Sequence, residues 1–244
     1  MNDTFDASVK LMETTHAMVE IIPAVMPDTF EDVVSDVARV RTSTQWVQID
    51  VMDGRLTQSI SWPYAPGSTH FEALVADEEG LPFWEDVNYE VDLMILNPFV
   101  DAEQWIDAGV ARIILHYKSL EHGNARELIE RLRARGTEVV LALLPTDDPA
   151  ILSPFADCID GVQCMGITRV GFQGEPFEER VYALVREIRA LYPEMPISID
   201  GGVNDETAPR LVAAGATRLV SGSFIFDSED AKASIAELQK ISNV

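Results

Sequence analysis

The segment from Arg112 to Leu144, RIILHYKSLEHGNARELIERLRARGTEVVLALL, contains the unit on which the fold is built. It begins with RIILHY and ends with EVVLALL, two short runs rich in Val, Ile and Leu, as buried strands are. Between them, apolar residues recur at i, i+3, i+4 and i+7, as on one face of a helix, at Ala125, Leu128, Ile129 and Leu132. Two such runs joined by an amphipathic helix indicate parallel strands with a crossover connection.

The same alternation continues in both directions along the chain. A second helical pattern consists of Val181, Leu184, Val185 and Ile188. Six further strand-like runs are VEIIPAV from Val19, WVQIDV from Trp46, YEVDLMI from Tyr89, GVQCMGI from Gly161, ISID from Ile197 and RLVSGS from Arg218. Eight such units in a chain of roughly 250 residues predict an α/β fold, a single-domain (β/α)8 TIM barrel, with a doubly wound open sheet as the alternative.

The composition describes an ordinary globular chain with a strong negative charge. Its 244 residues include 18 Lys and Arg against 41 Asp and Glu, a net charge of −23, which opposes binding to nucleic acid or to anionic lipid. No linker divides the sequence, so we expect a barrel over 18–244 after a polar N-terminal extension, 1–17. The sequence has neither a secretory leader pattern nor a membrane span, which predicts a cytoplasmic protein. The two cysteines, Cys158 and Cys164, are expected to be core thiols.

A barrel carries its catalytic groups at the C-terminal ends of the strands and in the loops that follow. We expect Asp53 to cap a turn and His116 to be a packed, hydrogen-bonded residue. Trp62 and Tyr64, in a long loop, either cover the barrel mouth or pack on the neighbouring helix. The polar positions at the strand ends are Gln48, Asp50, Asp53, Asp92, His116, the loop 166–176, Asp200–Gly202 and Ser221–Ser223.

Three glycine-containing loops follow the last three predicted strands. They are VGFQGEPF from Val170, DGGVNDET from Asp200 and SGSFIFDSED from Ser221. Glycine lets backbone N–H groups approach an anion, and barrels of this kind commonly bind phosphate at these loops. A single loop of this sort is better explained by tight turning alone. Three on adjacent strands favour a small phosphorylated metabolite as ligand.

Five segments resemble, in order and spacing, the D-ribulose-5-phosphate 3-epimerase family. They are VQIDVMDG from Val47, VDLMI from Val91, MGITRVGFQGEPF from Met165, ISIDGGV from Ile197 and AGATRLVSGSFIF from Ala214. The resemblance implies an isomerase that interconverts D-ribulose 5-phosphate and D-xylulose 5-phosphate. It also implies that Asp50 and Asp200 are the acid–base pair, acting on opposite faces of one sugar carbon.

The resemblance assigns further positions of the site. The phosphate would be bound by Gly171, Phe172, Gly174, Gly201, Gly202, Gly222 and Ser223. Other residues lining the site would be Ala24, where the family has serine, together with Met52, Met94, His116 and Met165. The family loop PGFGGQ is changed here to VGFQGE, with one extra residue before it, and Lys118 replaces a glutamate that follows the family's strand-four histidine.

The family also binds a divalent metal through two histidines and the two aspartates, and both histidines are replaced here. Gln48 and Asp92 stand in their positions, so the corresponding set is Gln48, Asp50, Asp92 and Asp200. One amide oxygen and three carboxylates suit Mg²⁺, Mn²⁺ or Ca²⁺ better than Zn²⁺ or Fe²⁺. Without an ion, converging carboxylates raise one another's pKa, so either a metal binds or at least one aspartate is protonated. No organic cofactor is expected.

Two other functions are consistent with the same barrel. Hexulose-phosphate synthase and orotidine-phosphate decarboxylase use an Asp-x-Lys-x-x-Asp segment, but this chain reads Asp50-Val51-Met52-Asp53 and lacks that lysine. A non-catalytic or altered-substrate phosphosugar-binding paralogue, which has lost the metal-binding histidines, is the main alternative to an epimerase. The expected partner is a small phosphorylated sugar, with neither nucleic acid nor membrane, and a homo-oligomer is possible.

Overall fold

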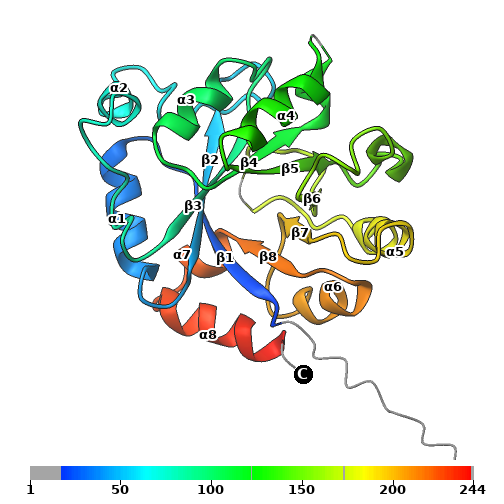
Figure 1. Cartoon of the computed structure of the whole chain (residues 1–244). Coiled ribbons are helices and arrows are strands. Elements are labelled where there is room, and N and C mark those ends of the chain that lie inside the picture. The colour runs from blue at the N-terminus through cyan, green and yellow to red at the C-terminus, as the bar shows by residue number, and fades with distance from the viewer. Residues whose placement is uncertain (1–17, 122, 173, 243–244) are drawn as a thin grey trace, which may run out of the picture.

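Eight parallel strands form one closed sheet in the computed structural model, which describes residues 18–121, 123–172 and 174–242 (Figure 1). Each strand pairs with the next in sequence, and β1 also pairs with β8, which closes the barrel. The strands are β1 (Glu20–Val25), β2 (Trp46–Met52), β3 (Asn88–Met94), β4 (Arg112–His116), β5 (Glu138–Leu143), β6 (Gly161–Met165), β7 (Ile197–Asp200) and β8 (Arg218–Ser221). The predicted TIM barrel is therefore confirmed, and the open-sheet alternative is wrong because β1 and β8 are not free edges.

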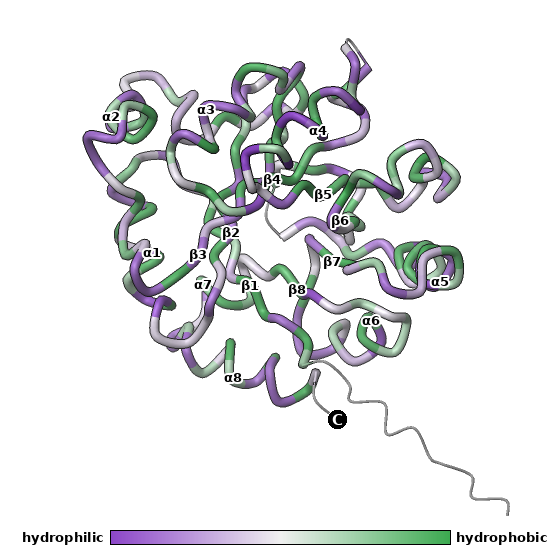
Figure 2. Tube along the Cα trace, in the orientation of Figure 1, coloured by the Kyte–Doolittle hydropathy of each residue, from purple (hydrophilic) through white to green (hydrophobic). Residues whose placement is uncertain are grey.

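Helices surround the sheet and cover its outer face (Figure 1). They are α1 (Phe30–Val40), α2 (Phe71–Val75), α3 (Asp101–Asp107), α4 (Ala125–Ala134), α5 (Val181–Leu191), α6 (Ala208–Ala214), α7 (Ser223–Phe226) and α8 (Ala231–Ile241). The two predicted helical patterns correspond to α4 and α5, and both bury the expected apolar face. Along α8, hydrophobic and hydrophilic residues alternate, as on a helix with one buried face (Figure 2).

The connection from β5 to β6 departs from the strand–helix alternation. It contains the 3-10 helix η2 (Pro149–Leu152) in place of an α-helix, and a second such turn, η1 (Tyr117–Leu120), follows β4. Pro145, Pro149 and Pro154 occur within ten residues, and each lacks the N–H that an α-helix interior needs. The predicted extension, 1–17, lies outside the described residues. None of the helices in the described ranges has the length and apolarity to cross a membrane.

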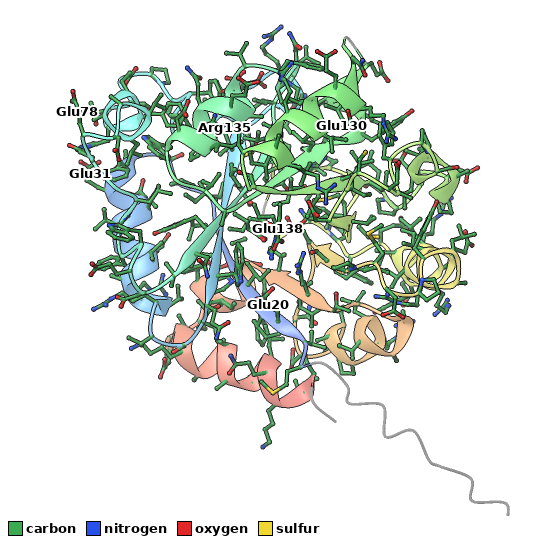
Figure 3. All side chains as sticks on the ribbon, in the orientation of Figure 1. Glu20, Glu31, Glu78, Glu130, Arg135 and Glu138 are labelled. Carbon is green, nitrogen blue, oxygen red and sulfur yellow. The ribbon has the colours of Figure 1, made fainter. Side chains whose placement is uncertain are left out.

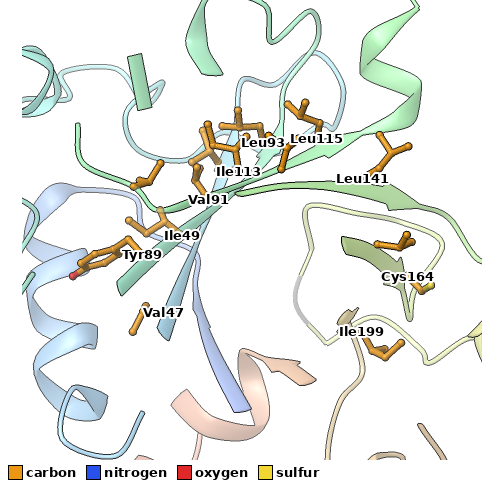
Figure 4. Close-up of a cluster of buried hydrophobic side chains, with 14 of the residues drawn as sticks. Val47, Ile49, Tyr89, Val91, Leu93, Ile113, Leu115, Leu141, Cys164 and Ile199 are labelled. Atoms are coloured by element: carbon orange, nitrogen blue, oxygen red, sulfur yellow. The ribbon is translucent and has the colours of Figure 1, made fainter. Parts of the chain in front are cut away.

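Apolar strand residues that face the helices form the main core. Figure 4 shows this layer, with Val47 and Ile49 of β2 beside Val91 and Leu93 of β3. Cys164 belongs to the same layer, and both cysteines are buried and unpaired, as predicted. Trp62 is fully buried with its ring centroid 5.5 Å from that of Trp105, so it packs on the helical layer and does not cover the barrel mouth. Alternate residues of each strand point the other way, into the barrel.

Candidate active site

Polar side chains occupy the inward-facing positions near the C-terminal ends of the strands. On β2 these positions are Gln48 and Asp50, two residues apart, so both side chains point to the same face. Asp50 is paired in register with Asp92 of β3, and Asp200 is paired with Met165 of β6. The strand pairing therefore brings aspartates from three strands into one layer at the barrel mouth.

The amide of Gln48 connects the two aspartates of the expected acid–base pair. Its Nε2 donates to Asp50 Oδ1 and to Asp200 Oδ2, in both cases at 2.8 Å. Asp50 is 7% exposed and Asp200 is 9% exposed, while Gln48 is fully buried. The two carboxylates thus come from strands that are three apart in the closed sheet and are held on the same buried amide.

Asp92 lies deeper and is bonded on both oxygens. His116 Nε2 lies 2.8 Å from Asp92 Oδ1, and Gln163 Nε2 donates to Asp92 Oδ2 at 3.0 Å. Gln163 also donates to Asp200 Oδ2 at 3.2 Å, so its amide links two of the aspartates. His116 is buried and hydrogen-bonded, as the sequence indicated.

Gln163 is a part of this network that the sequence analysis did not identify. Two signals pointed to it: it is a polar residue within the apolar run GVQCMGI, and it lies two residues before Met165, which lines the site. Both residues therefore face the same side of β6. The partners of its amide became visible only in the closed barrel.

Burial and mutual repulsion favour protons on the aspartates. Burial, followed by the charges of Asp200 and Asp92, raises the pKa of Asp50 well above its usual value. Burial and the charge of Asp92 raise the pKa of Asp200 to about 7. Burial disfavours the charged imidazole of His116, but the charge and hydrogen bond of Asp92 outweigh this effect and raise its pKa. At neutral pH, the cluster needs a bound proton or a cation.

The same three aspartates can offer ligands to a metal ion. Asp50, Asp92 and Asp200 each present an atom, and these atoms all lie within 4.8 Å of one another. The Oε1 atoms of Gln48 and Gln163 are buried and make no hydrogen bond with the described residues. As Gln48 lies, it presents Nε2 to the carboxylates; reversal of the amide would present the unpartnered Oε1 to an ion instead. The donor set therefore fits a hard divalent cation.

All seven positions expected to bind phosphate line one crevice. They share it with Asp50 and Asp200, and the set is Gly171, Phe172, Gly174, Gly201, Gly202, Gly222 and Ser223. Glycine is required where the loops approach closely: a Cβ on Gly166 would lie 2.0 Å from the carbonyl oxygen of Gly201, which itself has φ of +100°. The loops after β6, β7 and β8 thus meet beside the two aspartates.

The residues expected to line the site divide between two places. Ala24, Met94 and Met165 line the crevice beside the aspartates. Met52 is buried, with its sulfur 2.9 Å from where a Cβ on Gly171 would lie, so it supports the loop from below. His116 lines a separate, neighbouring cavity.

One carboxylate in the crevice opposes anion binding. Glu175 lies among the lining residues, next to Gly174. Its Oε1 accepts a hydrogen bond from Arg169 Nη1 at 3.0 Å, which offsets its charge. The changed loop VGFQGE therefore contributes an ion pair at the edge of the crevice. Asp53, by contrast, accepts bonds from the backbone N–H groups of Arg55 and Leu96 and caps the turn, as expected.

Comparisons with known proteins agree with this geometry. A ribulose-phosphate 3-epimerase from Treponema pallidum is 32% identical over 186 residues, covering 75% of this chain and 79% of the relative. The cytoplasmic isoform of ribulose-phosphate 3-epimerase from Oryza sativa subsp. japonica is 26% identical over 227 residues, covering 92% and 94%. The crystal structure of 3-hexulose-6-phosphate synthase from Salmonella typhimurium shares the fold, with a TM-score of 0.65 and 14% identity over 92% of this chain and 98% of that one. Residues 20–226 match the model of the ribulose-phosphate 3 epimerase family, and the chain belongs to that family.

Proposed function

We propose that the protein is a 3-epimerase that converts D-ribulose 5-phosphate to D-xylulose 5-phosphate, or acts on a close analogue. The observation that carries this proposal is that Asp50 and Asp200 line the same crevice as the three glycine-rich loops. A ligand whose phosphate lies on the loops would have its sugar carbons between the two carboxylates. Family membership and the names of the relatives support the same reaction.

Epimerisation next to a ketone needs two groups with different protonation states. One ionised carboxylate removes the proton from C3 on one face, and a protonated carboxyl group returns a proton on the opposite face. The raised pKa values of Asp50 and Asp200 favour this state, because the pair tends to hold one proton near neutral pH. Gln48 keeps the two carboxylates in fixed positions, and Met94 and Met165 provide apolar walls that exclude water.

With the amide of Gln48 reversed, its oxygen together with Asp50, Asp92 and Asp200 would hold a divalent ion at this site. Such an ion would supply positive charge to balance the negative charge of the enediolate formed between the two proton transfers. The Asp92–His116 pair lies on the other side of the cluster and fixes the carboxylate of Asp92. Epimerase activity measured with different divalent ions identifies the ion that binds.

The proposal is tested by a coupled epimerase assay and by incorporation of solvent deuterium at C3. We expect Asp50→Asn and Asp200→Asn each to lower kcat by about 10²–10⁴-fold, the range for loss of a general acid or base. Asp157→Asn, at a surface carboxylate that is 70% exposed, is the matched control and should retain activity. The assay is run with chelator and with Mg²⁺, Mn²⁺, Co²⁺ or Zn²⁺.

Two outcomes would contradict the proposal. One is unchanged turnover in both aspartate variants. The other is calorimetric binding of ribulose 5-phosphate to the wild type without epimerisation under any metal condition, which would identify the non-catalytic paralogue instead. The assigned partner is a small phosphorylated sugar, and the cytoplasmic rice relative supports a cytoplasmic location.

A further inference from the structure

Gln163 of β6 is a fully buried polar residue that takes no direct part in the proposed proton transfers. Its Nε2 donates to Asp92 Oδ2 at 3.0 Å and to Asp200 Oδ2 at 3.2 Å, while the sulfur of Met165, a weaker acceptor, lies at 3.9 Å. A side-chain amide nitrogen carries two hydrogens, so the two carboxylates use both of them. The amide therefore cannot turn over without losing two charge-assisted hydrogen bonds at once.

The Asp92 end of this connection is itself held in place. Asp92 accepts from Gln163 through Oδ2, and His116 Nε2 lies 2.8 Å from its Oδ1. Both oxygens of Asp92 are thus engaged, and its side chain is fully buried. Asp92 is therefore a fixed support that determines where the amide of Gln163 lies.

The two oxygens of Asp200 have different surroundings. Oδ2 accepts from Gln163 and, at 2.8 Å, from Gln48 Nε2, so amides from β6 and β2 hold the same oxygen. Oδ1 has no hydrogen-bond partner in the described part of the chain, yet it is not one of the buried atoms left without a partner. It is therefore the oxygen that is open to the crevice, which Asp200 lines.

We propose that Gln163 is a positioning residue: its amide, supported by Asp92, holds Asp200 Oδ2 so that Oδ1 faces the sugar carbon that is epimerised. This inference rests on the proposed function. With Gln48 as its only donor, the carboxylate of Asp200 could rotate about a single hydrogen bond. Proton transfer needs the reacting oxygen within hydrogen-bond reach of the carbon, and a misplacement of about 1 Å costs about a hundredfold in rate.

The test replaces Gln163 by residues of similar size that lack the amide nitrogen. In Q163M, kcat should fall by about 10–100-fold and KM for ribulose 5-phosphate should change by less than about threefold, because the amide contacts Asp200 and not the substrate. Q163E keeps the shape but has no N–H group, and kcat should fall at least as far. C164A alters a buried neighbour on β6 that faces the helices and should keep its kcat. Urea denaturation checks that each variant is folded.

The double variant Q163M/D200N distinguishes positioning from a general structural role. If Gln163 acts through Asp200, Q163M should change the kcat of D200N by less than about threefold. A fall as large as that in the wild-type background would overturn the proposal. Recovery of kcat in Q163M at a tenfold higher concentration of the divalent ion would also overturn it, because the amide would then act through the ion.

Crystal structures of the wild type and Q163M test the positioning without any measurement of activity. We expect Asp200 Oδ1 to face the crevice in the wild type, and the carboxylate to be turned or to take two orientations in Q163M. A carboxylate that is unchanged in Q163M would overturn the role of Gln163. If the wild type epimerises no ketose and the carboxylate still turns in Q163M, the proposed function fails and the positioning of Asp200 by Gln163 stands.

Discussion

At the base of the barrel Arg112 lies between Glu90 and Glu138, whereas at the mouth Asp50, Asp92 and Asp200 lie next to one another. Arg112 is 2% exposed; it forms an ion pair with Glu90 and donates from Nε to Glu138 Oε2 at 2.7 Å. Its guanidinium also lies 3.8 Å from the centroid of the Trp46 ring.

Glu20 and Glu138 lie near the centre of the ring of helices in Figure 3, and Arg218 lies within 3.4 Å of Glu20 and 3.6 Å of Glu138. The base therefore has cations among its acids. The mouth has two neutral amides and one histidine for three carboxylates. At the base, each buried carboxylate lies next to a guanidinium, and removal of either partner would destabilise the barrel. At the mouth, the carboxylates have no such partner, so they are available to bind a proton, a metal ion or a substrate.

The largest expected effect concerns the base. Arg112→Met should lower the free energy of unfolding by about 3–5 kcal/mol, because it leaves Glu90 buried without its cation. Urea denaturation of the apoprotein measures this change. The double variant E90L/R112M removes both charges and should be much less destabilised. If the single variant is within about 1 kcal/mol of the wild type, the base does not depend on its charge balance.

The second largest expected effect is the pH dependence of the free energy of unfolding, which arises mainly from the aspartates at the mouth. The unfolded chain has Asp200 at its usual pKa near 3.8, and the folded chain has it at about 7. The folded state therefore favours the proton, and this contribution to stability is complete below pH 4 and is lost as the pH rises through 7. At about 1.4 kcal/mol per pKa unit, the loss is up to about 4 kcal/mol.

Asp200→Asn should make this slope shallower when stability is measured from pH 4 to pH 8 in the presence of chelator, and the raised pKa of Asp50 supplies the slope that is left. The double variant E90L/R112M should retain most of it, since burial and the charge of Asp92 remain as the main causes of the raised pKa of Asp200. A wild type whose stability rises with pH more steeply than that of D200N would contradict the assignment of the slope to Asp200.

The smallest expected effect is stabilisation by a divalent ion. At pH 8 an ion at a hundred times its Kd should add about 2.7 kcal/mol to the stability of the wild type, because it binds only the folded cluster. Asp92→Asn removes one carboxylate of the set and should weaken this gain, whereas Arg112→Met should keep it. Thermal denaturation with Mg²⁺ or Mn²⁺, compared with chelator, measures the shift in Tm. Equal shifts in the wild type and D92N would place the ion elsewhere.

Most of the fold and part of the site could be predicted from sequence. The eight apolar runs are local features, and each forms a strand because its own residues favour one. Asp50 and Asp200 could be assigned to the mouth because Asp200 is the last residue of its run and Asp50 the last but one of its own, and all barrel strands end on the same side. The connection after β5 was harder to predict, because its prolines exclude an α-helix without indicating what replaces it.

The sequence by itself determined which residues face inward, since alternation along a strand is a local property. Only the closed barrel decided which inward residues meet. Gln163 and Asp200, 37 residues apart, share a hydrogen bond, and the loop after β2 reaches Lys118 and Arg169 to enclose one cavity. These contacts depend on strand stagger and on closure between β1 and β8, which are properties of the whole sheet that no segment encodes alone.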